Sequence, residues 1–295
     1  VVALCIGRYS IDPAEAFGAV GSYLHKILAK TGEKPTAMEN VVFVLRIPRI
    51  IGAIVIGAAL SLSGAVYQSV FKNPLVSPDI LGVSSGASVG AATAILLGGS
   101  LLSMQILAFV IGLGAVLLST AIPKLLKNNS NLMLVLSGTV VSAFFQALLS
   151  IIKFTAEGDE KLPAITFWLM GSLGSVSLTD LAISLIPIVV CCTGLMVLRW
   201  RINLLTLGDE EARTMGVNAR RLRTAVILSA TLITAAAVAV SGVIGWVGLV
   251  IPHLTRRMVG NNYRHLIPAS SLFGSVFLLM VDNLSRNLFA TEIPI

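Results

Sequence analysis

The sequence predicts an all-α, polytopic membrane protein, and three observations support that prediction. Hydrophobic residues make up 56% of the 295 residues and charged residues only 12%. The mean hydropathy is +0.91, far above that of a soluble domain. Apolar runs of about 20 residues, the length that crosses a bilayer as a helix, recur between short charged turns. We therefore expect one transmembrane domain over residues 1–295, with roughly eight to ten helices.

Six apolar runs have the length and composition of membrane spans. They lie at 41–67, 104–122, 132–152, 181–198, 224–240 and 268–289. Basic residues gather at one end of these runs, as at Lys124 and Lys127, and the positive-inside rule places such ends in the cytoplasm. By this count the first run crosses inward and the last run crosses outward.

Prolines interrupt two further apolar segments. Pro74 and Pro78 precede 80–97, whose glycines and serines form a face suited to close helix packing. Pro252 interrupts the other segment, 242–253. Its pattern leaves open whether it crosses the membrane or re-enters on the same side.

A weak internal repeat relates the two interrupted regions. Ala58, Ala59, Ser63, Gly64 and Pro74 recur at one offset as Ala236, Ala237, Ser241, Gly242 and Pro252. The first copy is expected to run inward and the second outward, the inverted arrangement common in transporters. Chance is the alternative, because small residues are frequent in membrane helices.

The topology predicts further helices beyond both ends of this sequence. The apolar run at 1–6 is too short to cross a bilayer, and the sequence does not begin with Met. The outward run 268–289 would leave the C-terminus outside, so we expect one more helix after Ile295.

A hydrophilic segment at 207–223, here called the charged loop, is the exception in this apolar chain. It lies within a connection of about 199–223 between two predicted spans. Asp209 is expected to cap a short helix with Glu210 and Glu211 in its first turn. Arg213 follows one turn on, and Gly216 is placed to end the helix.

A second helix is expected to begin at Asn218, a favourable capping residue. Its first turns contain Arg220, Arg221 and Arg223, which the positive N-terminal end of a helix dipole disfavours. Either the positive-inside rule or docking to a soluble partner can explain these arginines. A solvated turn between two spans is the alternative without a function.

Several classes of function lack their sequence signals. The chain has no P-loop motif, so we expect no ATP site of its own. His25, His253 and His265 lie far apart with no zinc spacing, and no metal site is expected. The net charge of +7 fits cytoplasmic loops and anionic membrane lipid better than nucleic acid. The three cysteines lie in apolar stretches and are expected in the core.

Several motifs in order resemble one family of membrane proteins. They are Arg46-Ile-Pro-Arg49, Gly57 to Gly64, Asn73-Pro-Leu75, Pro78 to Gly86, Gly208 to Arg223 and Gly245 to His253. From about Val41 to Ile295 the chain resembles the FecCD-type permeases, the membrane subunits of ATP-binding cassette (ABC) importers for iron-siderophores, haem and vitamin B12. Such permeases usually have ten spans.

The resemblance implies an assembly in the cytoplasmic (inner) membrane. It implies a homodimer of permeases, two ABC ATPase subunits that bind ATP and magnesium, and an extracytoplasmic solute-binding protein. This chain would bind no cofactor and catalyse no reaction. The charged loop would couple it to the ATPase, through Asp209, Glu210, Glu211, Arg213, Gly216, Arg220 and Arg221.

Two further sets of residues are candidates for function. Ser61, Ser63 and Gln68 are expected to line the translocation pathway with small, weakly polar groups. Helix packing through Gly57 and Gly64 is the alternative for that stretch.

The second set is Arg46, Arg49 and Arg286, which the span count places near the outer face, where basic residues are disfavoured. We expect them to dock the binding protein through carboxylate pairs. A private pair with Asp282, four residues away on one helical face, is the alternative for Arg286. Headgroup anchoring is the alternative for the other two.

Two other kinds of transport protein remain open at the level of sequence. One is an ion-coupled secondary transporter built on the inverted repeat, and the other is a structural or channel-like membrane subunit. The cargo is equally open: a ferric siderophore, haem or cobalamin is expected, and an oxyanion such as molybdate is the alternative.

Overall fold

The computed structural model describes residues 2–5, 11–29, 34–128, 130–156 and 160–288. In chain order its helices are α1 (Val2–Cys5), α2 (Pro13–Leu28), α3 (Ala37–Asn40), η1 (Val41–Arg46), α4 (Ile47–Phe71), η2 (Pro78–Leu81), α5 (Val83–Leu96), α6 (Leu101–Leu125), α7 (Asn131–Thr155), α8 (Lys161–Leu169), α9 (Leu178–Leu205), α10 (Asp209–Thr214), α11 (Ala219–Ser241), α12 (Val247–Val259) and α13 (Tyr263–Leu288). The described residues contain no strand. The all-α prediction is confirmed.

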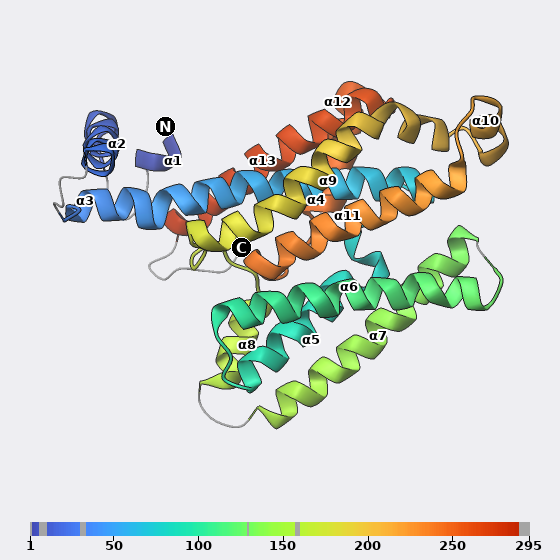
Figure 1. Ribbon diagram of the computed structural model, residues 1–295, viewed down its shortest axis with the longest axis horizontal. Helices are drawn as coiled ribbons and strands as arrows, with labels where there is room; N and C mark the ends of the chain where they lie inside the picture. The colour runs from blue at the N-terminus through green and yellow to red at the C-terminus, as the bar shows by residue number, and fades with distance from the viewer. Residues whose placement is uncertain (1, 6–10, 30–33, 129, 157–159, 289–295) are drawn as a thin grey trace.

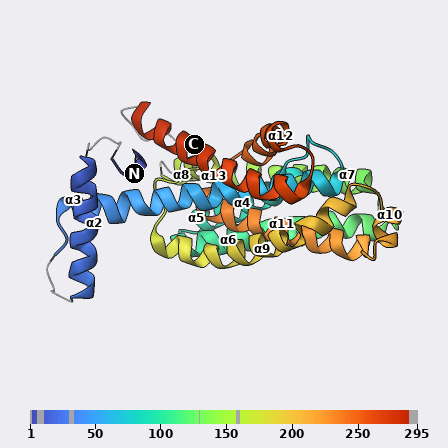
Figure 2. The ribbon, with the colours of Figure 1, turned by 90° about the horizontal axis from the view of Figure 1, so that it is seen from above.

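The long helices lie side by side with their axes running the same way along the molecule (Figure 1). Among the described residues, six helical stretches are long and apolar enough to cross a membrane: 37–71, 101–125, 131–155, 178–205, 219–241 and 263–287. Five of the six predicted spans fall within one of them, and the sixth, 268–289, overlaps 263–287 and extends beyond its described end. The charged loop with α10 lies at one end of the bundle, and α2 lies across the opposite end (Figure 2). The basic residues of α10 and its neighbours mark their end as cytoplasmic.

α4 is the central helix of the bundle. From Ile56 to Phe71 nearly all of its side chains are buried, and α9, α11, α12 and α13 surround it. Two glycines permit this close packing: a Cβ at Gly57 would overlap the backbone of Gly274, and a Cβ at Gly64 would overlap that of Gly248. The predicted packing through Gly57 and Gly64 is confirmed.

Replacing Gly64 with Val should prevent α12 from packing on α4, because the new side chain would occupy the space of the Gly248 carbonyl. We expect a loss of stability of about 3 kcal/mol or more, from overpacking with no room to relax. The measurement is the thermal unfolding of purified protein in detergent. Gly194→Val on α9 is the matched control, since nothing lies within 4 Å of its Cβ position, and equal stability of the two variants would contradict this packing.

The two proline-interrupted segments each return the chain through the bundle as a non-helical stretch followed by a short helix. Ser241, at the end of α11, lies beside Ser172, while Gly248 contacts Gly64 in the C-terminal half of α4. Arg256, near the end of α12, reaches Gln68 at the cytoplasmic end of α4. The segment 242–259 therefore crosses the bundle, which settles the question that the sequence left open.

The helices of the internal repeat run in opposite directions. Ser63 on α4 hydrogen-bonds Thr234 on α11, and Tyr67, one turn later on α4, hydrogen-bonds Thr231, one turn earlier on α11. Each helix is followed by a break and then a short helix, α5 or α12. The inverted arrangement that the repeat predicts is present. Residues 289–295, after which the sequence predicts one more helix, lie outside the described residues.

Candidate functional site: the cytoplasmic face

The charged loop has a defined backbone. α10 covers Asp209–Thr214, and Gly208 rather than Asp209 occupies the capping position, so Asp209 is the first helical residue. This corrects the predicted cap by one residue. Gly216 has φ +78°, the left-handed conformation that ends a helix at low cost only for glycine. Its N–H donates to the Arg213 carbonyl, and the predicted stop is confirmed.

Buried apolar side chains anchor this loop to the bundle. Ala212, Val217, Ala219 and Leu222 are all at most 9% exposed and belong to the same core as α4 and α9. The Asn218 side chain accepts a hydrogen bond from the Arg221 N–H, which confirms the predicted cap of α11. The loop is thus held rigidly between α9 and α11. These four apolar anchors were not predicted from the sequence, although they are interspersed among the charged residues of the loop.

The outward side of the loop is exposed and charged. Glu210, Glu211, Arg213, Arg220 and Arg221 all face solvent. Between Arg213 and Arg220 lies a hollow of about 550 Å³, bordered by Gly216 and Asn218. Two apolar side chains, Leu207 and Met215, are more than half exposed beside these charges. Such a surface, with charged and apolar groups around a hollow, suits contact with a soluble protein.

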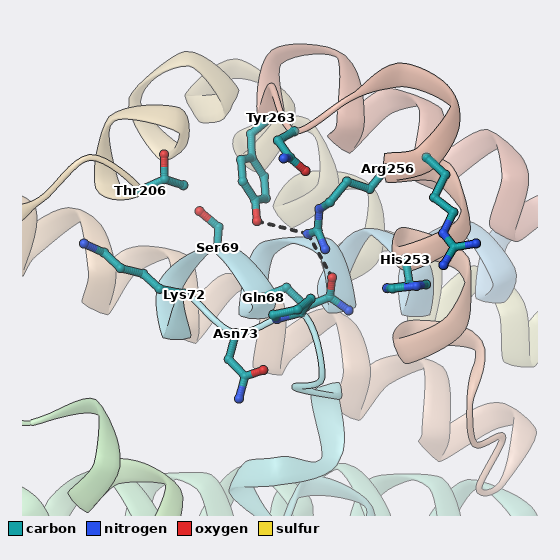
Figure 3. A pocket seen from close by; sticks show the side chains of 11 residues that line it. Gln68, Ser69, Lys72, Asn73, Thr206, His253, Arg256 and Tyr263 are labelled. Carbon is teal, nitrogen blue, oxygen red and sulfur yellow. Dashed lines mark hydrogen bonds between the residues drawn. The ribbon is translucent and has the colours of Figure 1, made fainter.

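A second and larger hollow, of about 620 Å³, opens at the cytoplasmic ends of α4, α12 and α13. We call it the basic pocket (Figure 3). Its lining contains Lys72, His253, Arg256 and Arg257 together with Gln68, Ser69, Asn73, Pro74, Thr206, Asn261 and Tyr263. No acidic side chain is among these described lining residues. The pocket therefore presents positive charge and neutral hydrogen-bonding groups.

Arg256 is the organised cation of the basic pocket. Its Nη2 atom donates to Gln68 Oε1 at 3.0 Å and to the Tyr263 hydroxyl at 3.2 Å, as Figure 3 shows. The Gln68 amide in turn donates to the Leu249 carbonyl. The Tyr263 N–H donates to the Asn203 side chain, which links the pocket to α9. This network of Arg256 was not predicted from the sequence, because its partners Gln68 and Tyr263 lie on other helices.

The predicted pathway residues lie in two different environments. Ser61 and Ser63 are fully buried, and their hydroxyls donate to the carbonyls of Ser270 and Ala230. These contacts hold α4 against its neighbours, as the packing alternative expected. Gln68 instead borders the basic pocket. A lining role for the two serines stays a prediction, and it now requires α4 to separate from α11 and α13 during transport.

Of the three arginines assigned to docking, Arg46 and Arg49 are buried and Arg286 is partly buried. Arg46 and Arg49 are each 5% exposed. Asp282, itself fully buried, accepts from Arg49 Nε at 2.6 Å and pairs with Arg286 Nε at 3.2 Å. Arg46 donates to the Leu4 carbonyl. The ion pair between Arg286 and Asp282, which was the alternative to docking, is present. Arg49 joins it, and the three side chains form a cluster that connects α4 to α13.

The burial of these arginine side chains corrects one assumption of the docking prediction, namely that they face a soluble partner. The sequence count placed the arginines near the outer face but could not show that Arg49 and Asp282, far apart in the chain, are in contact. A docking role for the three stays a prediction, and it now requires their side chains to leave these contacts. Among the described residues, no three His, Cys, Asp or Glu side chains gather as a metal site would require.

Within the described residues, six helices of spanning length, two interrupted segments that recross the bundle and a charged loop at the cytoplasmic end define a polytopic membrane protein. Comparison with known proteins identifies its family. A family model described as the FecCD transport family matches residues 1–295, and the chain belongs to that family.

Similar proteins agree with this assignment. The molybdate import system permease protein MolB of Haemophilus influenzae is 41% identical over 100% of this chain and 86% of its own length. A Helicobacter pylori protein named as an iron chelatin transport system permease is 42% identical, over 100% of this chain and 89% of its own. A solved structure, described as an inward-facing conformation of a metal-chelate type ABC transporter, is 39% identical. It has a TM-score of 0.86 and covers 99% of this chain and 88% of that one.

The chain is therefore a permease subunit of an ABC importer and a multi-pass protein of the inner membrane. Permeases of this family work with ATPase and binding-protein partners, and ATP hydrolysis generally takes place on the separate ATPase subunit.

Proposed function

We propose that this chain forms a homodimer that imports a metal chelate, and that the charged loop couples it to the ATPase. The observation that supports this proposal is the construction of the loop. Its charges and the hollow beside Gly216 face the cytoplasm, while Ala212, Val217, Ala219 and Leu222 fix it to the core. A partner that pushes on α10 would therefore move the ends of α9 and α11 rather than bend a flexible turn.

The displacement has a route into the bundle. α11 packs directly on α4, through the hydrogen bonds of Thr231 and Thr234 to Tyr67 and Ser63. α12 and α13 pack on the other sides of α4. When the ATPase dimer closes on ATP, movement of α11 would shift α4 against these helices. That shift supplies the change between two states that alternating access requires.

The cargo we propose is a metal chelate such as a ferric siderophore, haem or cobalamin. One relative is named for an iron chelate and another for molybdate, so an oxyanion is the second candidate. The basic pocket favours a cargo with negative charge in either case, because its cations face no acidic lining residue. Gln68, which borders that pocket, is the predicted pathway residue best placed to meet such a cargo.

Copurification tests the coupling role. A tagged permease should bring a P-loop ATPase out of the membrane, and the double variant Glu210→Lys/Glu211→Lys should bring out much less. The matched control is Asp12→Lys/Glu15→Lys, which makes the same charge change on exposed residues at the opposite end of the bundle. A permease that never retains an ATPase, yet transports on an ion gradient alone, would be a secondary transporter.

The ligand that copurifies with the binding protein would identify the cargo.

A further inference from the structure

A third hollow, of about 240 Å³, lies between the cytoplasmic ends of α6, α7 and α11, and the proposed function makes no use of it. We call it the interhelical pocket. Its polar lining residues are Lys124, Arg220, Arg223, Thr120, Ser130 and Thr224, and its apolar lining residues are Leu117, Pro123, Leu134, Ile227 and Leu228. The described lining residues include no acidic side chain. The pocket therefore combines three cations with an apolar wall.

The polar and apolar groups are separated by depth. α11 begins at the cytoplasmic end, so Arg220 and Arg223 come first, and Ile227 and Leu228 lie one to two turns further into the membrane. On α6, which ends at that side, Lys124 lies nearer the cytoplasm than Leu117. On α7, Ser130 precedes Leu134. Cations and hydroxyls thus lie at headgroup level, above aliphatic side chains at the level of the acyl chains.

Two of the cations also lie where the local electrostatic field of the chain disfavours positive charge. Arg220 and Arg223 lie in the first two turns of α11, where the helix dipole is positive and disfavours them. Lys124, from α6, lines the same small space. Three positive charges and a helix N-terminus that border one pocket favour the binding of an anion between them. A headgroup phosphate is such an anion, and the Ser130 hydroxyl, which accepts a hydrogen bond from the Met133 N–H, can donate its proton to a phosphate oxygen.

We propose that the interhelical pocket binds an anionic phospholipid of the cytoplasmic leaflet, with its phosphate among Lys124, Arg220 and Arg223 and an acyl chain along Leu117, Leu134, Ile227 and Leu228. Basic pockets between helices on the cytoplasmic side of a membrane take this class of ligand. Arg220 also borders the hollow beside Gly216 in the charged loop. A bound lipid would therefore contact the element that we propose couples to the ATPase.

Native mass spectrometry of the full chain, released from membranes with and without its partner subunits, tests this site. Phosphatidylglycerol and phosphatidylcholine are supplied as competing probes. The wild type should retain phosphatidylglycerol selectively, and Lys124→Gln/Arg223→Gln should retain it more than about tenfold less, since each cation near an anionic surface contributes roughly fivefold in affinity. Lys124→Arg/Arg223→Lys, which keeps both charges, should restore retention.

The control is Arg257→Gln/Arg264→Gln, which removes two cytoplasmic cations outside this pocket. If the control and the test variant lose phosphatidylglycerol equally, the overall positive charge attracts the lipid, and the proposal of a specific site is wrong. Displacement of the lipid by millimolar inorganic phosphate would show a free-anion site instead. Retention lost whenever the ATPase is bound would show that the ATPase covers these cations. Lipid retention by the isolated chain does not depend on an ATPase, so it can fail or succeed separately from the coupling proposal.

Discussion

Replacing Asp282 with Asn is expected to destabilise the protein by about 3–5 kcal/mol, the cost of removing one partner from a buried ion pair. Asp282 is fully buried, and its two carboxylate oxygens face Arg49 and Arg286. The substitution keeps the size of the side chain but removes the negative charge that pairs with both arginines. Thermal unfolding in detergent and the amount of protein in the membrane are the measurements.

Two controls separate the cluster from general effects of substitution. Asp180→Asn also changes a buried acid, but this carboxylate accepts hydrogen bonds from the backbone N–H and the hydroxyl of Ser177, so a smaller effect is expected. Adding Arg49→Met to Asp282→Asn should recover part of the lost stability, because it removes one of the two buried cations. Wild-type stability for Asp282→Asn alone would show that the cluster does not hold α4 to α13.

The cluster also affects how a docking role for these arginines can be tested by mutation. Reversal of Arg49 to Glu would place two carboxylates together in a buried site, so we expect loss of folded protein rather than weaker docking alone. A docking role for Arg46, Arg49 and Arg286 therefore has to be tested with variants that still fold. Binding that changes with ionic strength while the stability is unchanged would support that role.

Gly216→Val in the charged loop is expected to reduce uptake by at least tenfold while the protein still folds and reaches the membrane. Gly216 has φ +78°, which a β-branched residue adopts only with strain of about 1–3 kcal/mol. The turn would rearrange and move α10 relative to α11. Nothing lies within 4 Å of the Cβ position, so the effect would come from the backbone and not from a clash in the core.

The matched control for this variant is Gly98→Val, at the outer end of the bundle. Gly98 has φ +70° and an equally open Cβ position, so the two substitutions carry the same backbone strain at opposite ends. Uptake should persist in the control. Arg220→Glu/Arg221→Glu should also reduce uptake, through charge rather than through backbone strain. Normal uptake in both loop variants would mean that the loop is only a solvated turn.

The sequence predicted the membrane spans because their signal is local. Each apolar run is long enough to cross a bilayer, and each of the six coincides with an observed spanning helix over all or most of its length. The Gly216 stop and the Asn218 cap were predictable for the same reason, since a helix end depends on a few neighbouring residues. Asp209 was assigned one residue too far along, because Gly208 takes the cap position with no side chain to mark it.

What the sequence could not predict depends on contacts between distant segments. Arg49 and Asp282 are 233 residues apart in the chain, and only the packing of α4 on α13 brings them together. Gln68 and Arg256 meet through the packing of α4 on α12. Ser61 and Ser63 have the same small, polar character whether they line a cavity or hold helices together. Their burial could be read only from the structure.

The most direct test of the account is uptake into proteoliposomes that contain the permease, its copurifying ATPase and the binding protein with its ligand. We expect uptake that requires ATP inside the vesicle, is independent of proton and sodium gradients, and is lost in Gly216→Val but retained in Gly98→Val. Uptake driven by an ion gradient without ATP, or ATP-driven uptake that is unchanged in Gly216→Val, would contradict the proposal that the charged loop couples this permease to ATP hydrolysis.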